Sequence, residues 1–414
     1  MKLYLFPLLY IILAEAFNRL KACESWRGSQ KSQEGFTKED KEALNALLAL
    51  TLAPIFDDHY GIPWDPNTMA QRVLARVFRK AFMWDYKPNN IKVLKEAKPN
   101  FDKAAKEYVR KCIMDLGNDY RSSISYNNIE ARVITEEDVK SIADWVCDTI
   151  MKYDNEDVVY AAAKHLATRT EFEEVRDNLR PDLVNEIRED LDAKLASFAD
   201  YPVVREIAEG EGEYHEMMEL LEAYSWSRYT FRWQGYYTPI RCSILTHMLE
   251  TSLLAYLMAY EKMLMADSEE ERAKWKAMMG KAFKVGLYHD ITEIWTDDVP
   301  SPAKDGLDIR KIVEDQERYM TETKIYARLP ACVVSELRNG VMLEDAKGEE
   351  KDFYKAADYF SADLEVWWNV KAGARDHRFK KILYKSLEDK RRTLGARTAI
   401  RYFLAEIDDE KFFR

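Results

Sequence analysis

The sequence predicts an all-α fold, and three observations support this prediction. Apolar residues recur three and four positions apart in long stretches, such as residues 141–153 (SIADWVCDTIMKY) and 251–264 (TSLLAYLMAYEKML), as on one face of an α-helix. These stretches are rich in Ala, Leu, Glu, Lys and Arg, which favour helices. Only 14 Gly and 12 Pro interrupt the 414 residues. Because 47% of the residues are hydrophobic, the chain can bury real cores, and its length allows two or three globular domains.

The first apolar segment, residues 3–16 (LYLFPLLYIILAEA), has two interpretations. It resembles a short signal peptide, in which Ala14-Glu15-Ala16 would stand for the small-residue cleavage site. Alternatively it is a buried first helix. The segment is too short for a transmembrane span, so we expect no membrane association. The internal repeat described below favours the buried helix.

Charge and cysteine content limit the classes of partner and the compartment. The net charge of −11 argues against binding to extended nucleic acid, because a polyanion is held mainly by neutralising its phosphates. A local basic site can still bind one small anion. The five Cys are scattered, odd in number and without CxxC spacing, so neither a zinc knuckle nor a disulfide framework is indicated. A reducing, cytoplasmic location is the simplest prediction.

The two halves of the sequence resemble each other weakly over a long span. The Leu/Ala-rich segment 40–53 aligns with residues 246–259, and each is preceded by an aromatic segment and a loop that holds a Trp. Further along, Asp144 aligns with Asp358. Each single pairing is weak evidence, but the conserved order and nearly constant offset favour an internal duplication.

The boundary between the halves is predicted near residues 198–216 (FADYPVVREIAEGEGEYHE). There Gly210 and Gly212 interrupt a polar stretch between two helical patterns. We therefore predict two helical domains, residues 1–207 and residues 208–414.

The C-terminal half contains candidate metal ligands on three predicted helices. His247 lies in residues 246–259, His289 and Asp290 end the helical pattern of residues 281–290, and Asp358 lies in residues 352–368. Two imidazoles and two carboxylates suit Mn, Co, Fe or a similar ion, with water in the remaining positions. Metal-dependent phosphoester hydrolysis needs such ligands and open positions for water and phosphate. We predict one divalent transition-metal ion.

Candidate acid–base groups follow the second histidine. Glu293 lies four residues after His289, which places it on the same face if the helix continues for one turn. Asp298 lies in a loop that Pro300 and Pro302 stiffen. One carboxylate would orient or deprotonate the attacking water, and the other would protonate the leaving oxygen.

Together these residues form a recognisable pattern, RW…H…HDxxExxxxDxPxP…AD. It begins at Arg232-Trp233, continues through His247 and residues 289–302, and ends at Asp358. This pattern resembles the YfbR-type 5′-deoxynucleotidases of the HD superfamily, and every functional position is filled. The resemblance lies in the C-terminal half, whereas the N-terminal half matches only through the repeat.

The resemblance implies a role for each residue. His247, His289, Asp290 and Asp358 would hold one ion, and Glu293 and Asp298 would handle water and proton transfer. Arg232 would meet the substrate phosphate or sugar, and Trp233 would shape the nucleotide pocket. From the residues alone, the alternative for Arg232 is a surface salt bridge, and Trp233 is explained equally well by core packing. The substrate implied is a deoxyribonucleoside 5′-monophosphate, and the insertion between His247 and His289 alters the pocket rim.

The first half lacks these ligands at the aligned positions, which are Ser25, Lys41, Arg79, Lys80 and Met83. Lysine and arginine would repel a cation, so we predict that residues 1–207 form a catalytically silent, degenerate HD-like domain.

Nucleotidases of this type resemble proteins that pair as homodimers. The chain would then be an intramolecular pseudo-dimer, and further oligomerisation is left open.

The leading functional prediction is a metal-dependent phosphohydrolase that converts (deoxy)ribonucleoside 5′-monophosphates to nucleoside and phosphate. Two alternatives stay open at this point. One is a related HD enzyme, either a dNTP triphosphohydrolase or a nucleotide phosphodiesterase. The other is a non-enzymatic nucleotide sensor, against which the intact Glu293 and Asp298 argue. In each case the partner is a small-molecule nucleotide.

Overall fold

The computed structural model of the protein describes residues 5–23, 37–83, 88–124, 134–153, 157–233, 236–296, 304, 306–338 and 346–374. Every regular element in these ranges is a helix, and the only β-type pairing is an isolated bridge between Phe231 and Ser243. The prediction of an all-α fold is therefore confirmed.

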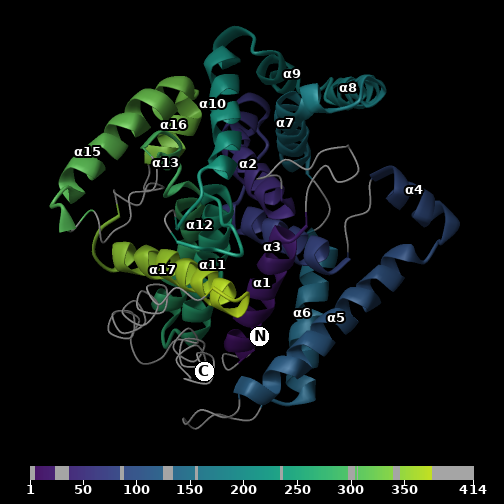
Figure 1. Cartoon of the computed structure of the whole chain (residues 1–414), viewed down its shortest axis with the longest axis vertical. Helices are drawn as coiled ribbons and strands as arrows, with labels where there is room; N and C mark the ends of the chain where they lie inside the picture. The colour runs from purple at the N-terminus through teal and green to yellow at the C-terminus, as the bar shows by residue number, and fades with distance from the viewer. Residues whose placement is uncertain are drawn as a thin grey trace.

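The helices of the first half are α1 (Phe6–Lys21), α2 (Lys38–Tyr60), α3 (Pro66–Met83), α4 (Pro88–Ala97), α5 (Phe101–Ile124), α6 (Glu136–Tyr153), α7 (Val158–Val175), α8 (Pro181–Ala196) and α9 (Pro202–Glu209). Those of the second half are α10 (His215–Trp226), α11 (Ile244–Met265), α12 (Glu269–Tyr288), α13 (Glu293–Thr296), α15 (Arg310–Met320), α16 (Ala331–Arg338) and α17 (Gly348–Lys371). Figure 1 shows their arrangement.

Short polar residues determine where the central helices begin. The Thr37 hydroxyl accepts a hydrogen bond from the Asp40 backbone N–H, and the Asp40 carboxylate accepts one in return from Thr37, which forms a capping box at the start of α2. Ser243 and Ser268 cap α11 and α12 in the same manner, each through its hydroxyl oxygen. Gly61 ends α2 with φ 60°, a left-handed conformation that glycine adopts at little cost.

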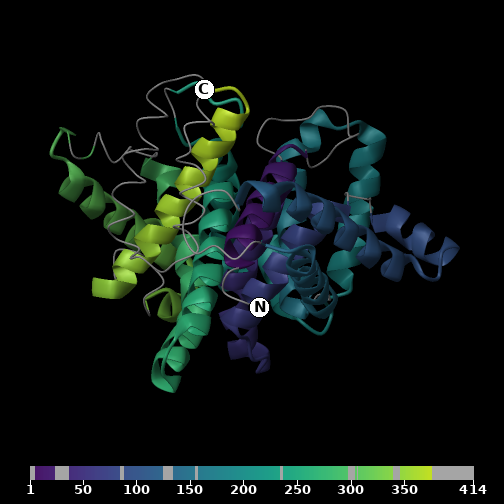
Figure 2. The same cartoon turned by 90° about the horizontal axis from the view of Figure 1, so that it is seen from below.

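The first helix is part of the core, as the buried-helix interpretation of the N-terminal apolar segment expects. Leu8, Leu9 and Leu13 on α1 are completely buried. The Tyr10 ring packs edge-on against Phe360 of α17, with centroids 5.4 Å apart. In Figure 2, α1 lies between α17 and helices of the first half. Within the described ranges, no helix combines the length and apolar character that crossing a membrane requires.

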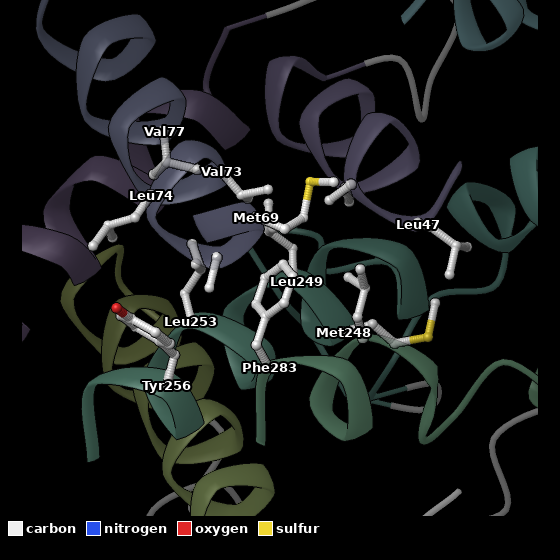
Figure 3. Packing of buried hydrophobic residues seen from close by; sticks show 14 of the residues in the cluster. Leu47, Met69, Val73, Leu74, Val77, Met248, Leu249, Leu253, Tyr256 and Phe283 are labelled. Atoms are coloured by element: carbon white, nitrogen blue, oxygen red, sulfur yellow. The ribbon is translucent and has the colours of Figure 1, made fainter. Parts of the chain in front are cut away.

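One hydrophobic core runs through both halves of the sequence. A continuous cluster of buried apolar side chains extends from Leu5 to Trp368. Figure 3 shows part of it, where Met69 and Val73 of α3 approach Leu249 of α11 and Phe283 of α12. The order of helices is compatible with the repeat, but the duplication and the boundary at residues 207 and 208 stay predictions.

Candidate metal centre

The structure brings the four predicted ligands together from three elements. His247 lies on α11, Asp358 lies on α17, and His289 and Asp290 directly follow α12. His247 Nε2 is 3.0 Å from Asp358 Oδ1 and 3.6 Å from Asp290 Oδ2. His289 Nε2 is 3.1 Å from Asp290 Oδ2 and 3.8 Å from Asp358 Oδ1. Two imidazole nitrogens and two carboxylates therefore face a common point.

Close packing of α12 on α11 holds His289 in place. A Cβ atom at Gly286 would lie 2.5 Å from the Ser252 Cα on α11, so only glycine allows this approach. The Gly286 carbonyl then accepts a hydrogen bond from His289 Nδ1 at 2.8 Å. The same glycine thus brings the helices together and orients the histidine.

Both histidines are oriented as metal ligands usually are. His247 Nδ1 lies 2.8 Å from Glu365 Oε1, and His289 Nδ1 faces a backbone carbonyl, so each Nδ1–H has an acceptor and each Nε2 is directed at the carboxylates. In the described part of the chain, His289 Nε2 is buried without an aligned hydrogen-bond partner. His247, His289 and Asp290 offer ligand atoms within 4.8 Å of one another. This donor set fits a divalent transition metal.

The electrostatics of the centre are those of a strong cation site. Burial lowers the pKa of His289, but the charges of Asp290 and Asp358 outweigh it and raise that pKa well above its usual value. Burial raises the pKa of Asp358, but its contacts with His247 and His289 outweigh it and hold that pKa well below the usual range. Both carboxylates therefore stay ionised beside any positive charge placed between them.

Arg232 and Trp233 lie at the edge of this centre. Arg232 Nη1 is 3.3 Å from Asp290 Oδ2, and its Nε is 3.3 Å from Glu365 Oε2. The Trp233 indole N–H donates to the same Glu365 oxygen at 2.6 Å. Trp233 has φ 62°, a backbone conformation that non-glycine residues rarely adopt. The arginine contacts a predicted metal ligand and is not a simple surface salt bridge.

Glu293 begins the short helix α13, after the turn that contains His289 and Asp290. Its side chain is buried, and its carboxylate interacts electrostatically with Lys304. Burial lowers the pKa of Lys304, but the charges of Glu317 and Glu293 outweigh it and raise that pKa. The other predicted acid–base residue, Asp298, lies outside the described residues.

Two polar residues near the centre were missed by the sequence reasoning. Glu365 follows Asp358 by seven positions, two helical turns, so the polar spacing on α17 carries a signal that could have found it. Lys304 follows the proline-containing loop after Glu293 and pairs with Glu317 at 3.2 Å. Its position two residues after Pro302 is a weaker signal, because a lone lysine is usually solvated.

At the aligned positions of the first half, side chains form separate ion pairs. Lys80 and Arg76 of α3 both pair with the buried Glu42. Burial raises the pKa of Glu42, but the charges of Arg76 and Lys80 outweigh burial and lower that pKa below its usual value. Lys41 Nζ lies 2.9 Å from Glu171. Asp144, the aligned counterpart of Asp358, pairs with Arg110.

The fold and the centre define a class of all-helical protein in which two histidines and two aspartates converge from α11, α17 and the turn after α12. Residues 219–410 match the family described as 5′-deoxynucleotidase YfbR-like. The matched segment begins in α10 and includes all four residues of the centre. The match supports an HD-type hydrolase in this part of the chain, and residues 1–207 lie outside it. A comparison with curated proteins finds no match.

Proposed function

We propose that the C-terminal half hydrolyses (deoxy)ribonucleoside 5′-monophosphates to nucleoside and phosphate with one bound divalent metal ion. The observation that carries this proposal is the convergence of two buried imidazole Nε2 atoms and two carboxylates, with each Nδ1 already bonded to an acceptor. The family match over residues 219–410 supports the same class of substrate.

The proposed ligands are His247, His289, Asp290 and Asp358. A bound ion would polarise the phosphoryl group and make the coordinated water more acidic. Glu293, buried next to the ligands, would then hold or receive the proton of the attacking water. Asp298 is proposed to protonate the leaving 5′-oxygen.

Two cationic side chains are placed to meet the phosphate. Arg232 is 3.3 Å from Asp290, and Lys304 lies near Asp290 and Glu293. Positive groups beside the phosphoryl oxygens stabilise the charge that builds up in the transition state. Trp233, held by Glu365, is proposed to form one wall of the nucleoside pocket.

The first half is proposed to be catalytically silent. Its cationic residues Lys41 and Lys80 already compensate the buried carboxylates Glu171 and Glu42, so a metal ion would meet net repulsion there. We propose that this half serves packing and support of the second half in an intramolecular pseudo-dimer.

A substrate panel with metal analysis tests the proposed function. Purified protein should bind about one transition-metal ion per chain and release phosphate from nucleoside monophosphates. His289→Ala should abolish both metal binding and turnover. Turnover confined to triphosphates or cyclic nucleotides would assign a related HD reaction. Tight nucleotide binding without turnover by the metal-loaded protein would indicate a sensor, and two tightly bound ions would contradict a single centre.

A further inference from the structure

A buried ion pair connects the first helix to α11 close to the metal centre. The Nζ of Lys21, the last residue of α1, lies 2.6 Å from Glu250 Oε1. Only 6% of the Lys21 side chain and 3% of the Glu250 side chain are exposed. Two charged groups taken out of water to this extent require a specific arrangement around them.

Lys21 provides the positive charge for a group of buried acidic side chains. Cys242, Glu250 and Glu365 offer ligand atoms within 4.8 Å of one another, an arrangement that could itself hold a cation. Burial lowers the pKa of Lys21, but its electrostatic interactions with the surrounding acidic groups, Cys242 and Glu250 first, outweigh burial and raise that pKa well above its usual value. The ammonium group of Lys21 therefore stays charged beside this group.

Glu250 is the carboxylate that balances this charge. The neighbouring Glu39 of α2 is completely buried, and burial together with the charge of Glu250 raises the pKa of Glu39 well above its usual value. Both effects disfavour the ionised form of Glu39. Glu250 instead accepts a charge-assisted hydrogen bond from Lys21 at 2.6 Å.

Ser361 lies between Glu250 and the proposed metal ligand His247. The Ser361 hydroxyl donates to Glu250 Oε2 at 3.2 Å, and the same Oγ lies 3.1 Å from His247 Nδ1. A hydroxyl has one hydrogen, so the Ser361 oxygen must accept the proton of Nδ1. Glu365 also accepts at Nδ1, at 2.8 Å. Both contacts hold Nδ1 on the side away from the proposed ligands, so that Nε2 faces Asp358 and Asp290.

We propose that Lys21 is a positioning residue for His247, acting through Glu250 and Ser361. This inference rests on the metal centre of the proposed function. Without the Lys21 hydrogen bond, Glu250 would no longer be held where it accepts from Ser361, and the Ser361 hydroxyl would no longer be fixed against His247 Nδ1. The orientation of His247 toward the metal would then be lost in part. A residue of the first half would thus be needed for metal binding by the second.

Metal affinity of the full-length protein tests this directly. Lys21→Met should weaken Mn²⁺ binding by about 10-fold, since changes in groups that support a ligand cost on the order of 10-fold to 100-fold in affinity. Lys41→Met is the matched control, because it removes a lysine from another buried lysine–glutamate pair, in which Glu171 also pairs with Arg228. The control should bind Mn²⁺ as the wild type does. Equal affinity of folded Lys21→Met and wild type would overturn the proposal.

A double-variant cycle separates the proposed route from a general structural effect. If Lys21 acts through Glu250, adding Lys21→Met to Glu250→Gln should cause no further loss of Mn²⁺ affinity. Lys21→Arg keeps the charge and should retain most of the affinity. If Lys21→Met fails to fold, Glu250→Gln alone carries the test, and wild-type affinity in that variant contradicts the proposal.

The inference and the proposed function fail in different ways. Wild-type Mn²⁺ affinity in folded Lys21→Met would refute the inference even if the enzyme is active. Absence of metal binding by the wild type would instead refute the proposed function.

Discussion

His247 Nδ1 lies 2.8 Å from Glu365 Oε1, and both side chains are buried. The other oxygen of Glu365 accepts from Trp233 Nε1 at 2.6 Å and lies 3.3 Å from Arg232 Nε. A single carboxylate therefore connects a proposed metal ligand with both residues proposed to meet the substrate. A change in the charge of Glu365 should therefore affect His247 and the two proposed substrate-binding residues at the same time.

Glu365→Gln should weaken Mn²⁺ binding by about 10-fold to 100-fold, because the neutral amide orients His247 less strongly and makes its imidazole a poorer ligand. Isothermal titration with Mn²⁺ measures this. Glu336→Gln is the control, since that carboxylate pairs with Lys284 of α12 at 2.9 Å. An unchanged affinity in Glu365→Gln would mean that the contact with His247 has no part in metal binding.

Glu293→Gln should keep the bound metal but lower kcat by roughly a hundredfold or more, because the amide keeps the shape of the side chain and removes its acid–base capacity. Metal content by elemental analysis and turnover of a nucleoside monophosphate are the two measurements. Retained turnover would remove Glu293 from the mechanism, and loss of metal would show that it supports the ligands instead.

Much of the candidate centre could be predicted because its signals are local. His289 and Asp290 are adjacent, and Glu293 follows within one turn. On α17, Asp358, Ser361 and Glu365 are spaced three and four apart, so all three lie on one helical face. The helices themselves follow from apolar periodicity and from caps such as Ser243. Each of these signals lies within a short stretch of sequence, where spacing alone predicts it.

The contacts that cross between the halves could not be predicted in this way. Lys21 and Glu250 are 229 positions apart, and no periodicity links them. Neither residue type suggests burial, because lysine and glutamate are almost always exposed unless paired. Only the packing of α1 beside α11 turns them into a buried ion pair. Tertiary packing also joins the predicted domains through one core.

His165 on α7 should make the protein less stable in mild acid. The side chain is buried, neither ring nitrogen has a hydrogen-bond partner among the described residues, and burial, with the charges of Arg169 and Lys194, lowers the pKa of His165 to about 4. Above its ordinary value of 6.5 the ring is neutral in both folded and unfolded chains. As the pH falls from 6.5 toward 4, only the unfolded chain gains the proton, so stability declines across that window.

The expected loss is about 2 kcal/mol between roughly pH 8 and pH 5, measured as the free energy of unfolding in urea. His165→Leu should remove this part of the acid sensitivity, while a substitution of the exposed His215 should leave it unchanged. An identical pH dependence in His165→Leu and wild type would show that the folded protein accepts the proton on His165.

The isolated segment 208–414 tests whether the second half needs the first. Without residues 1–207, this segment would expose the faces of α11 and α12 on which Leu249, Leu253 and Phe283 are buried against α3 (Figure 3). It would also break the hydrogen bond between the Thr51 and Tyr288 hydroxyls, which are 2.6 Å apart. Newly exposed apolar surface of this kind promotes association.

We therefore expect residues 208–414 alone to aggregate, to dimerise or to be poorly active, as measured by size-exclusion chromatography and phosphate release. The pseudo-dimer hypothesis adds a positive control. Co-expression of residues 1–207 with residues 208–414 should restore a one-to-one complex with metal binding, because covalent linkage only raises the effective concentration of the two surfaces. A stable, fully active monomer of residues 208–414 would show that the first half is not a required partner. It would also predict that Lys21 has no influence on His247, which joins this test to the metal-binding measurements on Lys21→Met.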